Sequence, residues 1–190
     1  MRRLPILMFV GALMVTGCAQ PLAAGEQIVS LGPQGGLALH VPAGWVMNRR
    51  PAPDDPFVTL TFGPEVGDEF SVLLTPVWPE LGADPDFGSP ESVYRIVAAA
   101  ARDVAAEAAE PELEVREFDG GRVGYYFWAT DRDLMGKSRI PPGEYLHLTQ
   151  GAIMVGDLLC TFTVLTNERP SGIIDAAMMM LRTAAHRTGA

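Results

Sequence analysis

The chain has 190 residues, of which 48% are apolar and 19% are charged, and its formal net charge at pH 7 is −9. This length predicts one domain with a sizeable core. The acidic balance argues against a nucleic-acid partner, because neutralising phosphates needs clustered Lys and Arg side chains.

The first residues have the features of a bacterial lipoprotein signal peptide. Arg2 and Arg3 give a positively charged start, and the apolar run over residues 4–15 is shorter than the roughly 20 residues of a bilayer-spanning helix. Val15-Thr16-Gly17-Cys18 resembles a lipobox, in which an aliphatic residue and two small residues precede cysteine. The resemblance implies cleavage after residue 17 and acylation of Cys18, with palmitate or a similar chain on its sulfur.

Two or three acyl chains would anchor the protein stably, so the membrane is an expected partner through Cys18. In bacterial lipoproteins, an aspartate directly after the acylated cysteine resembles an inner-membrane retention signal. This chain has Ala19 at that position. The expected location is therefore the bacterial cell envelope, at the periplasmic face of the outer membrane. An ordinary secretory signal that is cut within residues 19–24 is the alternative.

Residues 18–27 are expected to form a lipidated tether, and residues 28–190 a single α+β domain. The nine residues after Cys18 span at most about 30 Å when extended, so the domain is expected to lie close to the membrane. Without residues 1–17 the chain has 173 residues and a net charge of −11, since two arginines are lost. Acylation, rather than charge, would then hold it at an anionic membrane.

Alternating apolar residues and turn-forming residues predict a series of strands in the first half of the domain. The strands are expected over residues 28–31, 37–41, 57–62 and 70–77. Loops are expected over residues 48–56, 63–69 and 79–88, because these segments are rich in proline, glycine or acidic residues.

A helix follows, with Ser89 as its N-cap and Pro90 in its first turn. Apolar residues recur at helical spacing from Val93 to Val104, which predicts one packed face, and Pro111 ends the element.

The second half reads as four strands and a closing helix. The first two strands are expected over residues 113–118 and 122–130, before a polar loop over residues 131–143. The best hairpin joins residues 144–155 to 158–166 through Gly156-Asp157, which places Ile153 opposite Cys160. Apolar residues on both faces of this hairpin predict that both faces are covered. Ser171 is expected to cap the last helix.

These elements predict an α+β fold: an antiparallel sheet with helices on both faces, in a three-layer sandwich. The strand that ends in Val41-Pro42-Ala43-Gly44-Trp45, the long helix, the aromatic meander and the closing helix resemble the PsbP-like family, which includes DcrB-like bacterial lipoproteins. The resemblance covers residues 28–186. Members of this family mostly bind or scaffold larger assemblies and share no catalytic set, so the resemblance implies no site residues.

The sequence carries little sign of catalytic or metal chemistry. His40, His147 and His186 are far apart and lie in no zinc-binding motif, and no hydrolase or nucleotide-binding motif is present. Cys160 is expected to be a buried core thiol, because its neighbours are apolar. Acidic loops that include Glu65, Asp68 and Glu69 offer at most a loose cation site. We therefore expect no catalytic residues, no metal and no cofactor.

Three aromatic residues remain as a possible binding patch: Trp45, Trp78 and Tyr125. The two tryptophans lie beside proline-rich turns, where a ring either plugs the core or lines a partner site. We expect a non-enzymatic envelope protein that binds another envelope protein. The alternatives are a small-ligand or divalent-cation carrier and a hydrolase with dispersed catalytic residues.

Overall fold

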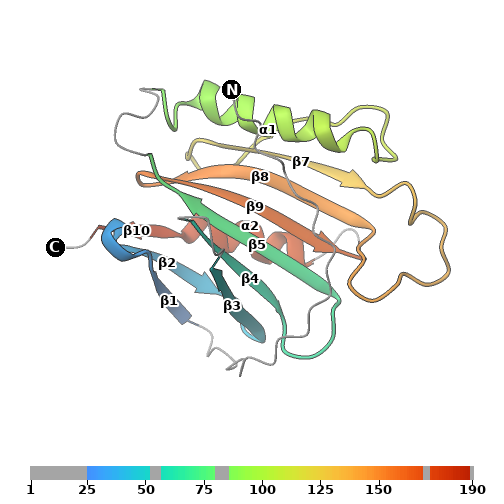
Figure 1. The fold of residues 1–190 in the computed structure, drawn as a ribbon, viewed down its shortest axis with the longest axis horizontal. Coiled ribbons are helices and arrows are strands. Elements are labelled where there is room, and N and C mark those ends of the chain that lie inside the picture. The colour runs from blue at the N-terminus through green and yellow to red at the C-terminus, as the bar shows by residue number, and fades with distance from the viewer. Residues whose placement is uncertain (1–24, 52–56, 80–85, 169–171, 189–190) are drawn as a thin grey trace.

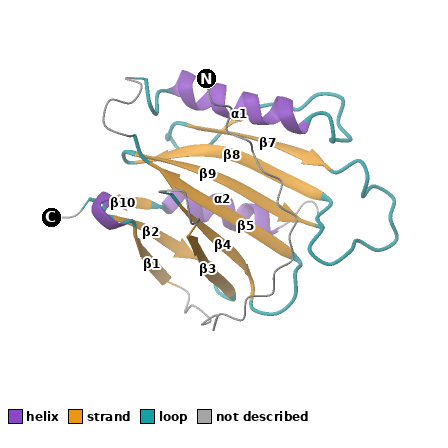
Figure 2. Ribbon diagram, viewed as in Figure 1, coloured by secondary structure: helices purple, strands orange, loops and turns teal. Residues whose placement is uncertain are grey.

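The computed structural model describes residues 25–51, 57–79, 86–168 and 172–188. Within them the chain forms two antiparallel sheets and two α-helices, so the expected α+β class and antiparallel pairing are confirmed (Figures 1 and 2). Cys18 and Ser171 lie outside the described residues.

The larger sheet has seven strands. In spatial order they are β3 (Trp45–Pro51), β4 (Val58–Pro64), β5 (Phe70–Val77), β9 (Leu158–Thr166), β8 (His147–Val155), β7 (Gly124–Thr130) and β6 (Arg116–Glu117). The smaller sheet has three strands: β1 (Gly25–Ser30), β2 (Gly36–Val41) and β10 (Ala185–Arg187), in the order β1-β2-β10. A short 3-10 helix, η1 (Gly32–Gln34), links β1 to β2.

The larger sheet consists of two meanders, β3-β4-β5 and β6-β7-β8-β9. They are joined where β5 pairs with β9, from Phe70 opposite Thr166 to Val77 opposite Leu159. Helix α1 (Pro90–Val104) follows β5 in the chain, and α2 (Gly172–Thr183) follows β9. The middle of the sheet is therefore built from segments that lie far apart in the sequence.

The hairpin of β8 and β9 has the predicted register. Ile153 lies opposite Cys160 and Val155 opposite Leu158, with Gly156 in the turn at a φ of 60°. Because neighbouring residues of a strand point to opposite faces, this register sends Leu158 and Cys160 to one face and Leu159 to the other.

Helix α1 covers the face of the larger sheet to which Leu159 points. The side chain of Ser89 accepts a hydrogen bond from the backbone N–H of Ser92, which caps the helix as expected. Val93 and Val97 pack with Phe127 of β7 in the smaller of two cores.

Helix α2 and the smaller sheet cover the opposite face. Met180 and Leu181 of α2 pack with Leu37 and Leu39 of β2 and with Phe162 of β9 in the main core. The two helices thus pack in different cores. The smaller sheet beside α2 is an addition, since a single sheet was expected.

The structure corrects several expected elements. Residues 48–51, expected in a loop, belong to β3, and the three residues of β10 were not expected as a strand. The strand expected over residues 113–118 is limited to Arg116–Glu117. Residues 25–27, expected in the tether, form the start of β1.

Candidate functional site

Trp45 lies in the main core, so it does not belong to a surface patch. Its side chain is 5% exposed. Its ring centroid is 4.8 Å from that of Phe70 and 6.5 Å from that of Phe62. The first residue of β3 lies opposite Pro64 and points inward with Met47, which pairs with Phe62. The expectation that Trp45 could line a binding surface is therefore wrong.

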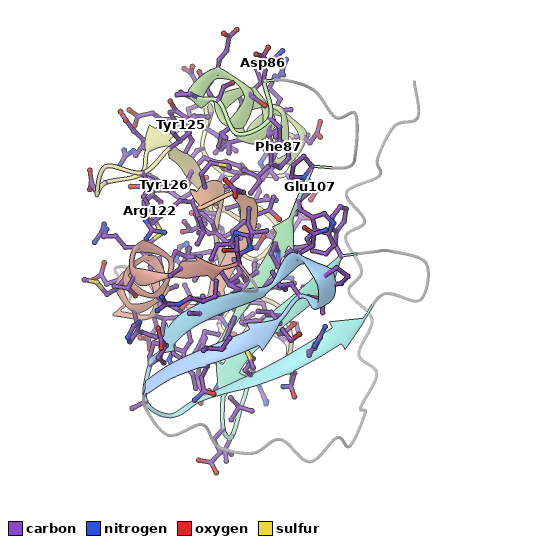
Figure 3. All side chains as sticks on the ribbon, turned by 90° about the vertical axis from the view of Figure 1, so that its left-hand side faces the viewer. Asp86, Phe87, Glu107, Arg122, Tyr125 and Tyr126 are labelled. Carbon is purple, nitrogen blue, oxygen red and sulfur yellow. The ribbon has the colours of Figure 1, made fainter. Side chains whose placement is uncertain are left out.

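Tyr125 lies on the α1 face of the larger sheet. Its ring packs edge-to-face with that of Tyr94 of α1, at a centroid separation of 5.4 Å. Tyr126, the next residue, contacts the main core instead. Figure 3 shows these two tyrosines on opposite sides of β7. Tyr125 is half-buried by the helix and lies on the other face of the sheet from Trp78.

Of the residues of the predicted patch, Trp78 lines a cleft. It follows the last residue of β5, is half-buried, and packs edge-to-face with Phe57 at 4.9 Å between centroids. The cleft has a volume of about 280 Å³. We call it the distal cleft; its lining residues are Pro33, Gln34, Trp78, Pro79, Asp157, Leu158, His186 and Thr188.

Four segments that are distant in sequence form the distal cleft. They are η1, the end of β5, the turn between β8 and β9, and β10. The imidazole Nε2 of His186 lies 2.7 Å from the backbone oxygen of Gln34. Since a carbonyl oxygen only accepts, Nε2 carries the proton of this bond. The bond fixes one wall of the cleft.

The distal cleft combines apolar and polar surface. Trp78, the two prolines and Leu158 supply the apolar part, and Asp157, Gln34, Thr188 and His186 supply hydrogen-bonding groups. Such a mixture suits recognition of a partner's side chain or of a small molecule, because apolar contact gives affinity and a few polar groups fix orientation.

Cys160 is a core residue, as the sequence predicts. It is 1% exposed, and burial raises the pKa of its thiol from the ordinary 9.0 to about 12, against a smaller lowering by the charge of Arg122. A thiol in this state is protonated near neutral pH and is therefore a poor nucleophile.

We expect Cys160 to resist alkylation by iodoacetamide in the folded protein at mildly alkaline pH and to react after denaturation. The unfolded thiol loses its proton at lower pH than the folded one. The contribution of this thiol to the free energy of unfolding is therefore fully present below about pH 9 and is lost as the pH rises to about 12. Mass spectrometry after timed alkylation, with the denatured protein as control, measures this. Rapid labelling of the folded chain would contradict the burial.

Glu110, Thr130 and His147 form a hydrogen-bonded group at the end of β7. The hydroxyl of Thr130 donates to Oε1 of Glu110 at 2.7 Å, and the backbone N–H of Thr130 donates to Oε2 at 2.8 Å. Nδ1 of His147 lies 3.3 Å from the same hydroxyl. Because the Thr130 hydroxyl gives its proton to the carboxylate, the group fastens the segment after α1 to the sheet rather than activating a nucleophile.

The acidic loop that contains Asp68 serves a structural purpose. Oδ2 of Asp68 accepts a hydrogen bond from the backbone N–H of Gly143 at 2.8 Å. Burial, with the charges of Asp68 and Glu69, raises the pKa of Tyr145 above its ordinary value. Across the part of the chain that the structure describes, no three His, Cys, Asp or Glu side chains converge as a metal site requires.

Sequence reasoning therefore found one side chain of the distal cleft and missed the others. It predicted the turn that contains Asp157, but nothing in that turn indicates that Asp157 and Gln34 line the same cleft. His186 was noted only for its lack of a zinc motif. The strand that carries it has three residues and is defined by its pairing with β2, which no local pattern reveals.

Within the described residues, neither helix has the length and apolar character needed to cross a bilayer. No family model and no curated protein matches the chain. A similar solved structure is the solution structure of cyanobacterial PsbP (CyanoP) from Synechocystis sp. PCC 6803, at 16% identity over 94% of this chain and 99% of that chain, with a TM-score of 0.49. At this TM-score the similarity carries no argument about function.

Proposed function

We propose that the chain is a membrane-anchored envelope lipoprotein that binds another envelope protein and catalyses no reaction. The lipobox at residues 15–18 supports the anchor. β1 begins at Gly25, seven residues after Cys18, so the intervening chain spans at most about 25 Å. The proposed location is the periplasmic face of the outer membrane, and the proposed domain type is PsbP-like.

The observation that carries the binding role is the position of the distal cleft relative to the start of β1. Gly25 lies opposite Val41, and β1 runs six residues from there to η1, whose Pro33 and Gln34 line the cleft. Six extended residues cover about 20 Å. The chain that leads to Cys18 thus enters β1 at the end away from the cleft, so the cleft stays open to a partner if that end faces the membrane.

The variant Cys18→Ala tests the anchor. We expect it to lose incorporation of labelled palmitate and to move from the membrane fraction to the soluble periplasmic fraction, because the acyl chains supply the membrane affinity. The variant Cys160→Ala is the matched control and should keep both label and location. A Cys18→Ala protein that stays in the membrane fraction would refute lipid anchoring.

The variant Trp78→Ala tests the cleft. A photoreactive amino acid at Asp157 is expected to give a discrete crosslinked product in cells, and the same amino acid at Glu65, outside the cleft, is expected to give none. Adding Trp78→Ala should remove the product, since aromatic anchors commonly dominate binding energy. A product that persists would place the partner elsewhere.

A small-ligand carrier is the second candidate, because the cleft volume of about 280 Å³ accommodates a small molecule. Native mass spectrometry of the gently purified protein distinguishes the two. A reproducible excess mass that disappears in Trp78→Ala would favour the carrier.

A further inference from the structure

β1 is an edge strand with one open side. Among the described residues it pairs with β2 on one side only, and Figure 1 shows it at the outer edge of the smaller sheet. An open edge presents backbone N–H and C=O groups to any chain that can align with it. Proteins usually protect such edges with charged residues, proline, bulges or very short strands.

The other open edges are protected in these ways, whereas β1 is not. β3 carries Arg49 and Arg50 and ends in Pro51, while β6 has two residues and β10 has three. β1 has six residues with no Lys, Arg or Pro. Its one charged side chain, Glu26, is already paired with Arg187 at 3.0 Å.

The outward face of β1 also carries an exposed apolar side chain. Ile28 is 63% exposed, although its neighbour Val29 is 5% exposed in the main core. A second strand along the open edge would cover Ile28. It would do so without disturbing the contacts that β1 makes with the core.

We propose that β1 pairs antiparallel with β1 of a second copy of this chain. In an antiparallel pair, opposite residues point to the same face, so symmetric pairing must be centred on a residue. Centring on Ile28 places the two Ile28 side chains together and each Glu26 opposite Ser30. Centring on Gln27 would place Ile28 opposite Glu26, and apolar pairs are the more favourable ones. In the register centred on Ile28, no two like charges lie opposite each other.

This pairing would join two smaller sheets into one continuous six-stranded sheet. It does not depend on the anchor or on the distal cleft, so it goes beyond the proposed function. A single strand pair buries little surface, and the copies repel each other through a net charge of −9 each. The association is therefore weak and becomes stronger as salt screens the repulsion.

Cysteine crosslinking of the full-length protein tests the register. In Ile28→Cys the two sulfurs meet across the symmetry axis, because opposite Cα atoms lie about 4.5–5.5 Å apart and a disulfide spans about 4.4–6.8 Å. Diamide accepts the electrons and protons released when the bond forms. Because Ile28 is exposed, the variant should fold, and circular dichroism compares it with the parent chain.

Two variants control for chance collision. Glu26→Cys lies opposite Ser30 and should not link to itself, but it should link to Ser30→Cys when the two are mixed. Asn48→Cys sits on the exposed part of the protected edge β3. We expect Ile28→Cys to dimerise at least about tenfold faster than Glu26→Cys or Asn48→Cys alone, because only its sulfurs fall within bridging distance. The rate should increase with salt.

Equal rates for the three single variants would overturn the proposal, as would a rate for Ile28→Cys that falls with salt. A product of Ile28→Cys with a different protein, in place of the dimer, would show that another chain occupies the edge and would also overturn it. None of these results bears on the Cys18→Ala and Trp78→Ala tests of the proposed function.

Discussion

Replacing Gly151 by alanine is expected to lower the free energy of unfolding by about 3 kcal/mol, the upper end of the usual cost of overpacking a core. Gly151 lies in β8 opposite Tyr126 on one side and Phe162 on the other. A Cβ atom there would lie 2.3 Å from the backbone oxygen of Tyr125 and 2.7 Å from both Cζ of Phe162 and Cβ of Tyr126. The nearest atom belongs to the backbone of the adjacent strand, so no side-chain rotation relieves the contact.

Denaturant unfolding followed by circular dichroism measures this effect. The matched control is Gly172→Ala at the start of α2, where a Cβ atom would meet nothing within 4 Å. That variant should keep its stability or gain up to about 1 kcal/mol, because alanine restricts the unfolded chain. If Gly151→Ala and Gly172→Ala had the same free energy of unfolding, the strands β7, β8 and β9 would have to move apart at little cost to make room for the added methyl group.

The second large effect is expected for Trp45→Ala, which should lower the free energy of unfolding by about 3–5 kcal/mol. The change removes a ring that is 5% exposed and that packs on Phe70 and Phe62. The loss combines transfer of apolar surface with the cavity that remains. β3 is the strand most affected, since Trp45 is its first residue and points into the core.

Trp78→Ala is the matched control for this variant. Trp78 is half-buried beside the distal cleft, so its removal should cost clearly less stability than removal of Trp45. Thermal unfolding of the two variants, side by side, measures the difference. A larger loss in Trp78→Ala would mean that the cleft wall, rather than the interior beneath β3, limits the stability of the sheet.

The two tryptophans also show what local sequence cannot determine. Both lie next to turns at strand ends, and the sequence around them is similarly rich in proline. Trp45 is covered because β3 extends the sheet beyond β4 over the main core. That extension was not expected, since Arg49, Arg50 and Pro51 are typical of a loop. Edge strands tolerate such residues because one side makes no ladder hydrogen bonds.

Elements with strong periodic patterns were predicted well for a physical reason. β5 and β9 have the expected bounds, and the N-cap at Ser89 and the register of the β8–β9 hairpin follow from neighbours in the sequence. β10 and the distal cleft depend instead on contacts between the two ends of the chain. His186, for example, bonds to a carbonyl oxygen 152 positions away, which spacing alone cannot reveal.

The junction between β5 and β9 has a consequence for how the chain reaches this structure. Each meander forms from neighbouring segments, but the junction pairs Phe70 with Thr166, across the whole of α1 and three strands. The entropy of closing so long a loop must be lost before the junction contributes any stability, which slows folding. In any partly folded chain that has formed the first meander before β9 pairs with it, one edge of β5 is open. Such an open edge favours aggregation.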